Sequence, residues 1–300
     1  MEDMLFSRPQ VEYGTRPLVE CLADSAQGAE RCRRLAEAVG ARARMLSDPE
    51  TELAQGALAD ALLIDLGEDS GPALDRLFDL VEAGDARGSF RSVVHVAPAL
   101  IDPAVAHLAS SDVALLCQAS DMEIAAELSA ALAAPRTETL REQGEGTTLR
   151  HLSEEVGRIA RVLAQLSAAE SSSRSFTLPA VAEAAEAPSA TSVRAILRAR
   201  RLRDQFFPAD MFADPAWDML LDLILARIEQ RMVAVSSLCI AASVPPTTAL
   251  RWIKRMTDEG LFVRTADPRD GRRVFIELSD DAAAAMTACL RATMRLGAPI

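Results

Sequence analysis

Two hydrophobic periods alternate along the first part of the chain. Short apolar runs, typical of strands covered on both faces, alternate with stretches whose apolar residues recur every three or four positions. The expected strands cover residues 18–22, 41–46, 61–64, 92–96 and 113–117. The expected helices cover residues 26–39, 49–58, 71–83, 103–108 and 121–132. This alternation predicts a parallel α/β sheet in the flavodoxin-like, doubly wound order.

The last third of the chain has a different pattern, with helices first and a pair of strands near the end. The expected helices cover residues 191–207, 236–242, 247–259 and 280–296, and a further one begins at Pro215 with Asp214 as its N-cap. The expected strands cover residues 262–264 and 274–278. A helix, a short helix, a turn, a second helix and a two-stranded hairpin, in this order, predict an α+β winged helix-turn-helix domain.

The segments outside these two regions have their own patterns. Residues 1–15 read as an irregular arm, and residues 167–190 have the Ala-, Ser-, Glu- and Pro-rich composition of a linker. Residues 149–166 predict a connecting helix with apolar residues at coiled-coil spacing, which would form either a dimer seam or a contact with its own domain. The expected domains are therefore 16–134, a flavodoxin-like regulatory domain, and 191–300, the winged helix.

Charge is distributed unevenly between these two domains. The full chain carries 32 basic and 44 acidic side chains, a net charge of -12, which by itself argues against a nucleic-acid partner. Residues 191–300, however, carry 16 basic and 13 acidic side chains, whereas residues 1–190 carry a net charge of -15. Lys254 is the only lysine, and arginine is the better two-pronged donor to phosphate and guanine. The C-terminal part is therefore compatible with DNA.

Cysteine and histidine are too scattered to indicate a metal site. The five cysteines include no CxxC pair, and the three histidines stand far apart, so we expect no metal and no cofactor. The N-terminus lacks the apolar core of a signal peptide, and the uncharged stretch at 232–250 is interrupted by Pro245 and Pro246, so no membrane segment is expected. A reduced, cytoplasmic location is the simplest expectation.

The second helix of the helix-turn-helix pair has two unlike sides. Ala249, Ile253 and Met256 fall on one side, which we expect to be buried. The other side carries hydroxyls and cations, which suit contacts with phosphates and base edges. These expected DNA-binding residues are Thr247, Thr248, Arg251, Lys254 and Arg255.

Four segments of this region form a recognisable set: residues 249–256 (ALRWIKRM), 259–261 (EGL), the wing 267–273 (DPRDGRR) and Leu278-Ser279. In these segments the region resembles the MarR family of winged-helix transcription regulators. The resemblance implies that Arg272 or Arg269 enters the minor groove, that Asp270 and Asp267 orient the wing, and that Arg273 adds a contact. It also implies a homodimer through helices 191–207 and 280–296. The first 190 residues have no counterpart in typical family members.

The N-terminal domain resembles a response-regulator receiver that has lost part of its site. Asp65 stands at the end of the third strand, where receivers carry the phosphoacceptor. Ala23 replaces the first residue of the acidic pair before Asp24, the fourth strand ends at Ala97 without a hydroxyl, and the fifth ends at Gln118 without a lysine. Without these partners a transferred phosphoryl group loses its charge stabilisation. We expect a degenerate pseudo-receiver; a strand-end aspartate that caps a turn and an unrelated ligand-binding flavodoxin-like domain remain alternatives.

Together these patterns predict a homodimeric, sequence-specific regulator of transcription that binds double-stranded DNA. The N-terminal domain would modulate it through a regulatory protein partner or through dimer geometry. Two alternatives keep part of this hypothesis: a response regulator controlled by phosphorylation of Asp65, and an adaptor whose winged helix binds protein. An enzyme is not expected, because no nucleophile–base pair, catalytic carboxylate pair or cofactor motif stands out.

Overall fold

The computed structural model describes residues 16–55, 59–87, 90–108, 112–133 and 187–296. The expected arm at 1–15, the connecting helix at 149–166 and most of the expected linker at 167–190 lie outside the described residues. The chain divides into two compact units, Met1–Ala97 with Ser110–Pro135, and Pro98–Ala109 with Arg136–Ile300. We call the first the α/β unit and the second the winged unit.

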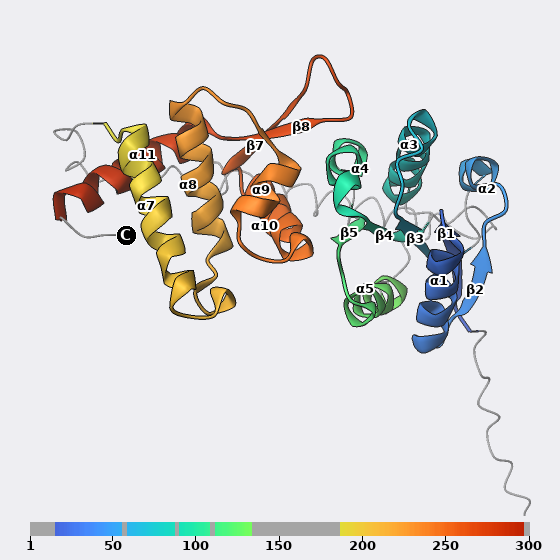
Figure 1. Cartoon of the computed structure of the whole chain (residues 1–300). Coiled ribbons are helices and arrows are strands. Elements are labelled where there is room, and N and C mark those ends of the chain that lie inside the picture. The colour runs from blue at the N-terminus through green and yellow to red at the C-terminus, as the bar shows by residue number, and fades with distance from the viewer. Residues whose placement is uncertain (1–15, 56–58, 88–89, 109–111, 134–186, 297–300) are drawn as a thin grey trace, which may run out of the picture. The chain divides into compact units, whose positions relative to one another are not determined.

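The α/β unit is a parallel sheet with helices on both faces. Its strands are β1 (Leu18–Ala23), β2 (Arg42–Met45), β3 (Ala61–Leu66), β4 (Arg91–Val96) and β5 (Ala114–Cys117), in the order β2-β1-β3-β4-β5. Its helices are α1 (Ala26–Ala38), α2 (Pro49–Gln55), α3 (Pro72–Ala86) and α5 (Asp121–Ala133). Figure 1 shows α1 and α5 on one side of the strands and α3 on the other. The strand order confirms the doubly wound prediction.

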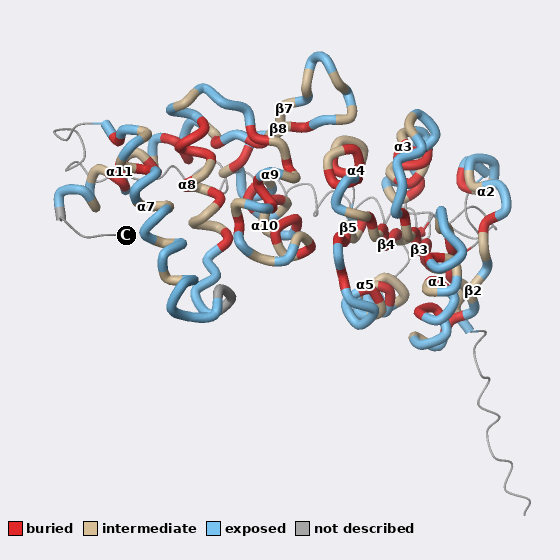
Figure 2. Tube along the Cα trace, in the orientation of Figure 1, coloured by how far each residue is buried: buried red, intermediate tan, exposed pale blue. Residues whose placement is uncertain are grey.

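Alternation along the strands sorts side chains between the two faces of this sheet. Val19 and Cys21 of β1 face α1 and α5, and they form a core there with Leu63 of β3 and Val93 of β4. Figure 2 shows these central strands buried, while the outer sides of the helices are exposed. Burial on both faces explains why β1, β3 and β4 read as largely apolar runs, whereas the edge strand β2, with the sequence RARM, is partly exposed.

Caps and packing set the ends of the helices. Ser25 caps α1, since its side chain accepts the backbone N–H of Gly28 at 3.0 Å. Helix α3 runs to Ala86, beyond the expected end at residue 83, and its Gly84 lies against the ring of Phe90, where a Cβ atom would come within 2.2 Å. The glycine therefore permits the close approach of α3 to the start of β4.

From Ala190 onward the winged unit has the predicted order of elements with one added strand, and it also includes the helix Ile101–Leu108, which the sequence pattern placed in the first domain. Its elements are α4 (Ile101–Leu108), α7 (Ala190–Leu202), α8 (Pro215–Ile228), β6 (Val233–Ala234), α9 (Val235–Ala241), α10 (Pro246–Asp258), β7 (Phe262–Ala266), β8 (Val274–Leu278) and α11 (Asp280–Leu296). Short 3-10 turns occupy Pro98–Leu100, Arg203–Gln205 and Ala209–Phe212. The helix expected at 191–207 therefore ends five residues early, as a 3-10 turn that begins at Arg203.

A three-stranded antiparallel sheet and three helices make the core of this unit. The strand order is β6-β8-β7, and the unpredicted β6 pairs Val233 with Ile276 of β8. Helix α8 packs against β8, α9 and α10. An ion pair joins α7 to α8, where Nε of Arg200 lies 2.7 Å from a carboxylate oxygen of Asp218 and both side chains are largely buried. The helix-turn-helix pair thus rests on a packed base.

Candidate nucleic-acid interface

Helices α9 and α10 form the helix-turn-helix pair, joined by a tight turn. Ser243 in this turn has a left-handed backbone with φ of 54°, and Pro245 and Pro246 follow it. Proline at the first position of a helix fixes the backbone angle that the helix needs. The sequence SVPP therefore ends α9 and starts α10 at a fixed place, which positions the first turn of α10.

One side of α10 is buried and the other is open. Ala249, Leu250, Ile253 and Met256 are buried against the rest of the unit. On the remaining surface Arg251 and Arg255 are exposed, while Thr248 and Lys254 are half-buried. These four side chains therefore lie on the open side of α10, and their contact with DNA stays a prediction.

Thr247 departs from this prediction. The residue is only 1% exposed, so it packs inside the unit and does not lie on the open side of α10. It stands one turn before Leu250, which is also buried, and residues three apart share one face of a helix. The buried arc of α10 is therefore wider than the pattern Ala249, Ile253, Met256 indicated, and Thr247 belongs to it.

Two cations of α10, Lys254 and Arg255, have weak partners on their own helix. Nζ of Lys254 lies 3.8 Å from Asp258, and Nε of Arg255 lies 2.9 Å from Glu259, each one turn further along. The guanidinium of Arg255 also lies over the ring of Trp252, 5.2 Å from the ring centroid, which is within the range of a cation–π contact. Exposed pairs of this kind contribute about 0.3–0.5 kcal/mol, so phosphates can displace the acids at small cost.

The wing is the hairpin of β7 and β8, which extends from the unit as a long loop (Figure 1). Its base is closed by two backbone bonds, from Asp267 N to Arg273 O and from Arg273 N to Asp270 O, both 3.0 Å. The aspartate carboxylates also bind backbone: Asp267 accepts the N–H of Arg269 at 2.9 Å, and Asp270 accepts the N–H of Arg272 at 3.0 Å. These bonds are what an orienting role of Asp267 and Asp270 requires.

The wing arginines differ in how far they reach into solvent. Arg269 and Arg273 are exposed, whereas Arg272 is half-buried. Asp270 pairs with Arg273, whose Nε lies 3.5 Å from its carboxylate, and it also accepts the backbone N–H of Arg272.

A second polar cluster lies at the strand ends of the α/β unit, around Asp65. A carboxylate oxygen of Asp65 lies 2.7 Å from Nδ1 of His95, and the other lies 3.6 Å from Nη1 of Arg31. A carboxylate only accepts, so the His95 proton points at Asp65. Arg31 in turn pairs with Asp121 at 2.7 Å and donates to the carbonyl oxygen of Ala119 at 2.9 Å. Asp65 therefore lies inside a closed set of charges.

Opposing effects act on the pKa of Asp65. Burial alone would raise the pKa of this carboxyl, but the hydrogen bond and charge of His95, followed by the charge of Arg31, outweigh burial and lower the pKa below its usual range. The carboxylate is ionised at neutral pH and already has two partners. Asp24, the other acid that the sequence singled out here, accepts the backbone N–H groups of Gly67 and Glu68.

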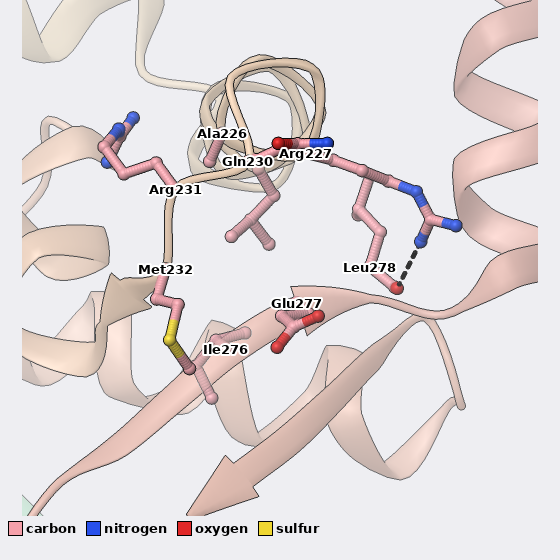
Figure 3. Close-up of a pocket in the computed structure, with 9 residues that line it drawn as sticks. Ala226, Arg227, Gln230, Arg231, Met232, Ile276, Glu277 and Leu278 are labelled. Atoms are coloured by element: carbon pink, nitrogen blue, oxygen red, sulfur yellow. Dashed lines mark hydrogen bonds between the residues drawn. The ribbon is translucent and has the colours of Figure 1, made fainter. Parts of the chain in front are cut away.

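A pocket of about 250 Å³ opens in the winged unit between the end of α8 and β8 (Figure 3). Leu223, Ala226 and Ile276 give it an apolar floor. Arg227 at its rim donates to the carbonyl oxygen of Leu278 and pairs with Asp280, and Arg231 lies near Glu229 and Asp222. Its cations are thus engaged with neighbouring protein groups.

Two kinds of feature are absent from the described residues. No group of three or more His, Cys, Asp or Glu side chains in this part of the chain is arranged to hold a metal ion. Among the same residues, no helix has the length and apolar character needed to cross a membrane.

Sequence reasoning missed one polar contact of the helix-turn-helix pair. Asp102 of α4 binds both the backbone N–H and the hydroxyl of Ser236 in α9. The two residues are 134 positions apart, so neither periodicity nor a local motif could have joined them. The one local signal is that the N-cap residue of α9 is Ala234, which has no side chain able to cap the helix.

Comparisons with known proteins gave matches among solved structures alone. No protein-family model matches the chain, and no curated protein matches it. A probable transcriptional regulator from Pseudomonas aeruginosa is similar over 33% of this chain and 75% of its own, with 26% identity and a TM-score of 0.24. The transcription regulator MarR from Oenococcus oeni PSU-1 is similar over 35% of this chain and 78% of its own, with 20% identity and a TM-score of 0.24.

A third similar structure is the transcriptional regulator Tm0710 from Thermotoga maritima, over 36% of this chain and 69% of its own, with 20% identity and a TM-score of 0.23. All three are described as regulators of transcription, and the matched share is about a third of this chain. With TM-scores this low, the winged helix is established by its own elements and strand order.

Proposed function

We propose that this chain is a sequence-specific, DNA-binding regulator of transcription of the MarR type. One observation supports this most: α10 buries one side and presents Thr248, Arg251, Lys254 and Arg255 on the other, in the same unit as a wing with exposed arginines. A helix with this composition, following a tight turn from a shorter helix, is suited to the major groove of DNA. The closed charge cluster at Asp65 gives no comparable open surface.

The proposed mechanism separates positioning from reading. Arginines of the wing and the cations of α10 hold the phosphate backbone, which fixes the register without reading sequence. Arg251 and Arg255 then read base edges, since a guanidinium donates two parallel hydrogen bonds to guanine. Arg269 or Arg272 occupies the minor groove, with the wing held in shape by Asp267 and Asp270.

A homodimer is part of the proposal, supported by an apolar surface after α7. Phe206 is 74% exposed and Met211 is 62% exposed, and Leu202 and Phe207 add to the same segment. Exposed apolar residues in such a cluster mark association surfaces in soluble proteins. A second copy would cover them. In the family that the sequence resembles, the dimer forms through helices that flank the winged domain, and the helices predicted at 191–207 and 280–296 are similar in placement.

The N-terminal part of the proposal is a pseudo-receiver that acts without phosphorylation. Its support is the set of contacts around Asp65, whose two oxygens face His95 and Arg31. A phosphoryl group on this carboxylate would have to displace both. The domain then modulates the winged unit through a protein partner or through dimer geometry.

The test starts from an operator selected out of a pool of random duplexes with the full-length chain. On this operator, Arg251→Ala or Arg255→Ala should weaken binding by about 1–3 kcal/mol and relax the preference at one position. Arg272→Ala should lower affinity more evenly across sequences. Arg33→Ala is a matched control, since Arg33 lies exposed on α1 and pairs with Glu30 of the same helix.

Two results would contradict the proposal. One is unchanged electrophoretic mobility shifts for all three variants on the selected operator. The other is an affinity that stays flat between low and physiological salt, because phosphate contacts release counterions and lose affinity as salt rises. An operator with two half-sites about one helical turn apart, roughly 10 base pairs, would support the homodimer.

A further inference from the structure

Helix α9, the first helix of the helix-turn-helix pair, begins without a capping group of its own. Its N-cap residue is Ala234, which has no side-chain acceptor. The first N–H groups of any helix lack partners inside the helix, so they need an acceptor from elsewhere. In this structure the acceptor comes from a distant part of the sequence.

Asp102 of α4 supplies this acceptor. Its Oδ1 accepts the backbone N–H of Ser236 at 3.0 Å, and its Oδ2 accepts the hydroxyl of Ser236 at 2.6 Å. Both oxygens of the carboxylate are therefore used on one residue of α9. Hydrogen bonds to a carboxylate are stronger than neutral ones, and a negative charge at the start of a helix is favourable.

Apolar packing accompanies this polar contact. Helix α4 contacts α9 and also β8, the central strand of the wing sheet. Ile101, Ala104, Val105 and Leu108 of α4 are all buried. Residues 98–109 accordingly group with the winged unit, although they lie between β4 and β5 in the sequence.

We propose that α4 is a built-in restraint on DNA binding, with the Asp102–Ser236 contact as its latch. The inference rests on the proposed DNA-binding function. In a helix-turn-helix complex the first helix of the pair crosses the DNA backbone. A carboxylate held at the start of that helix repels phosphates, and α4 itself occupies space beside α9. DNA and the latched position of α4 therefore compete.

The expected consequence is a reduced apparent affinity for DNA. When only a fraction of molecules has the latch open, the apparent dissociation constant rises by the inverse of that fraction. Any event that draws α4 away from α9 then raises affinity without changing a single DNA contact. The segment that connects β4 to β5 thereby becomes the element that regulates the winged unit.

The test compares full-length Asp102→Ala with the wild type on a fluorescent random-sequence duplex of about 30 base pairs, long enough to cover a dimer site. Loss of the latch should raise affinity about fivefold or more, the lower end of typical coupling between sites. Asp112→Ala is the matched control, because it removes the same charge from an exposed side chain outside α4. Its affinity should stay within twofold of the wild type, roughly the effect of one surface charge.

Asp102→Asn serves as a second variant if Asp102→Ala folds poorly. It removes the charge but keeps one acceptor oxygen, so its affinity should lie between those of wild type and Asp102→Ala. Hydrogen exchange without DNA provides an independent reading of the latch. The amides at the start of α9 should exchange faster in Asp102→Ala than in either the wild type or Asp112→Ala.

The outcomes separate this inference from the proposed function. Faster exchange with unchanged affinity would show that the contact exists and does not restrain DNA binding, which overturns the inference. Unchanged exchange would show that the contact is absent, which also overturns it. If neither the wild type nor any variant binds the duplex or a selected operator, the proposed function itself fails, and the restraint fails with it.

Discussion

Two surfaces of this molecule combine aspartate with arginine and use them in opposite ways. At the strand ends of the α/β unit, Asp65 and Asp121 face Arg31 directly, so that acid and base neutralise each other. In the wing, Asp267 and Asp270 each direct a carboxylate oxygen at the backbone N–H of a residue two positions on, and the second oxygen of Asp270 also lies near a guanidinium, 3.5 Å from Nε of the exposed Arg273. The same residue types therefore close one surface and leave arginines exposed on the other.

The difference shows that composition alone does not reveal which arginines are available to a partner. An aspartate that binds backbone N–H groups fixes the shape of a loop, and the arginines of that loop keep much of their positive charge. An aspartate that faces a guanidinium removes that charge at close range. The partner of each carboxylate is therefore the feature to compare, and three experiments can break or sharpen this comparison.

The largest expected effect is a loss of stability when the charge cluster around Asp65 is broken. Arg31→Gln leaves Asp65 half-buried without its guanidinium and should destabilise the α/β unit by about 2 kcal/mol, less than for a fully buried pair. Both tryptophans, Trp217 and Trp252, lie in the winged unit, so their fluorescence follows that unit alone. The variant should shift the urea transition seen by far-UV circular dichroism and leave the tryptophan transition in place.

Unfolding by acid should reveal the same loss of stability in Arg31→Gln. The lowered pKa of Asp65 gives stability that is present above the unfolded value of about 3.9 and disappears as pH falls through the folded value. Without Arg31 the folded pKa rises, less stability is gained at neutral pH, and acid unfolding should begin at a higher pH. Arg33→Gln, in an exposed pair with Glu30, is the control and should unfold like the wild type.

An intermediate effect is expected in the wing. Asp270→Ala removes the acceptor that holds the N–H of Arg272, and it should weaken binding to a selected operator about three- to tenfold, the value of one hydrogen bond. Charge alone predicts the opposite result, a gain in affinity, because the change removes an acid from the surface proposed to bind DNA. Asp258→Ala is the matched control. It also removes one acid, the partner of Lys254 on α10, and it should raise affinity through charge alone.

A rise in affinity for Asp270→Ala, equal to that of Asp258→Ala, would contradict the orienting role of Asp270. The comparison between the two surfaces would then reduce to net charge. Titration by fluorescence anisotropy at two salt concentrations separates the two accounts, because a purely electrostatic change grows as salt falls.

The smallest expected effect is none at all. Incubation of the full chain with acetyl phosphate and magnesium should leave its intact mass unchanged, because His95 and Arg31 already occupy the carboxylate of Asp65. A gain of one phosphoryl group that disappears in Asp65→Ala would reverse this reading. The strand-end cluster would then be an open site and the contrast with the wing would fail.

Much of the fold follows from the sequence because its signals are local. The central strands of the α/β unit are largely apolar runs, and the turn before α10 is marked by two prolines, so both could be located by pattern. The two-residue strand β6 is too short to carry a pattern, and its existence depends on β8 beside it. Local signals therefore predict most elements and miss a strand that forms only by pairing with a neighbouring strand.

The candidate site shows the same limit. The exposed side of α10 was predictable for Thr248, Arg251, Lys254 and Arg255, but the burial of Thr247 depends on how the start of α10 packs. The position of Asp65 at the end of a strand was visible in the sequence, whereas its partners His95 and Arg31 come from β4 and α1. Long-range pairs such as Asp102 with Ser236 leave no pattern to read.

Lys254 has a practical consequence for following this molecule in solution. It is the only lysine in 300 residues, and it stands on the face of α10 that carries Arg251 and Arg255, with its side chain 44% exposed. An amine-reactive dye or an isotope-labelled acetyl group would therefore mark this helix and no other side chain. Lys254 is thus the single lysine side chain to which a spectroscopic reporter can be attached, at the surface where DNA binding is proposed.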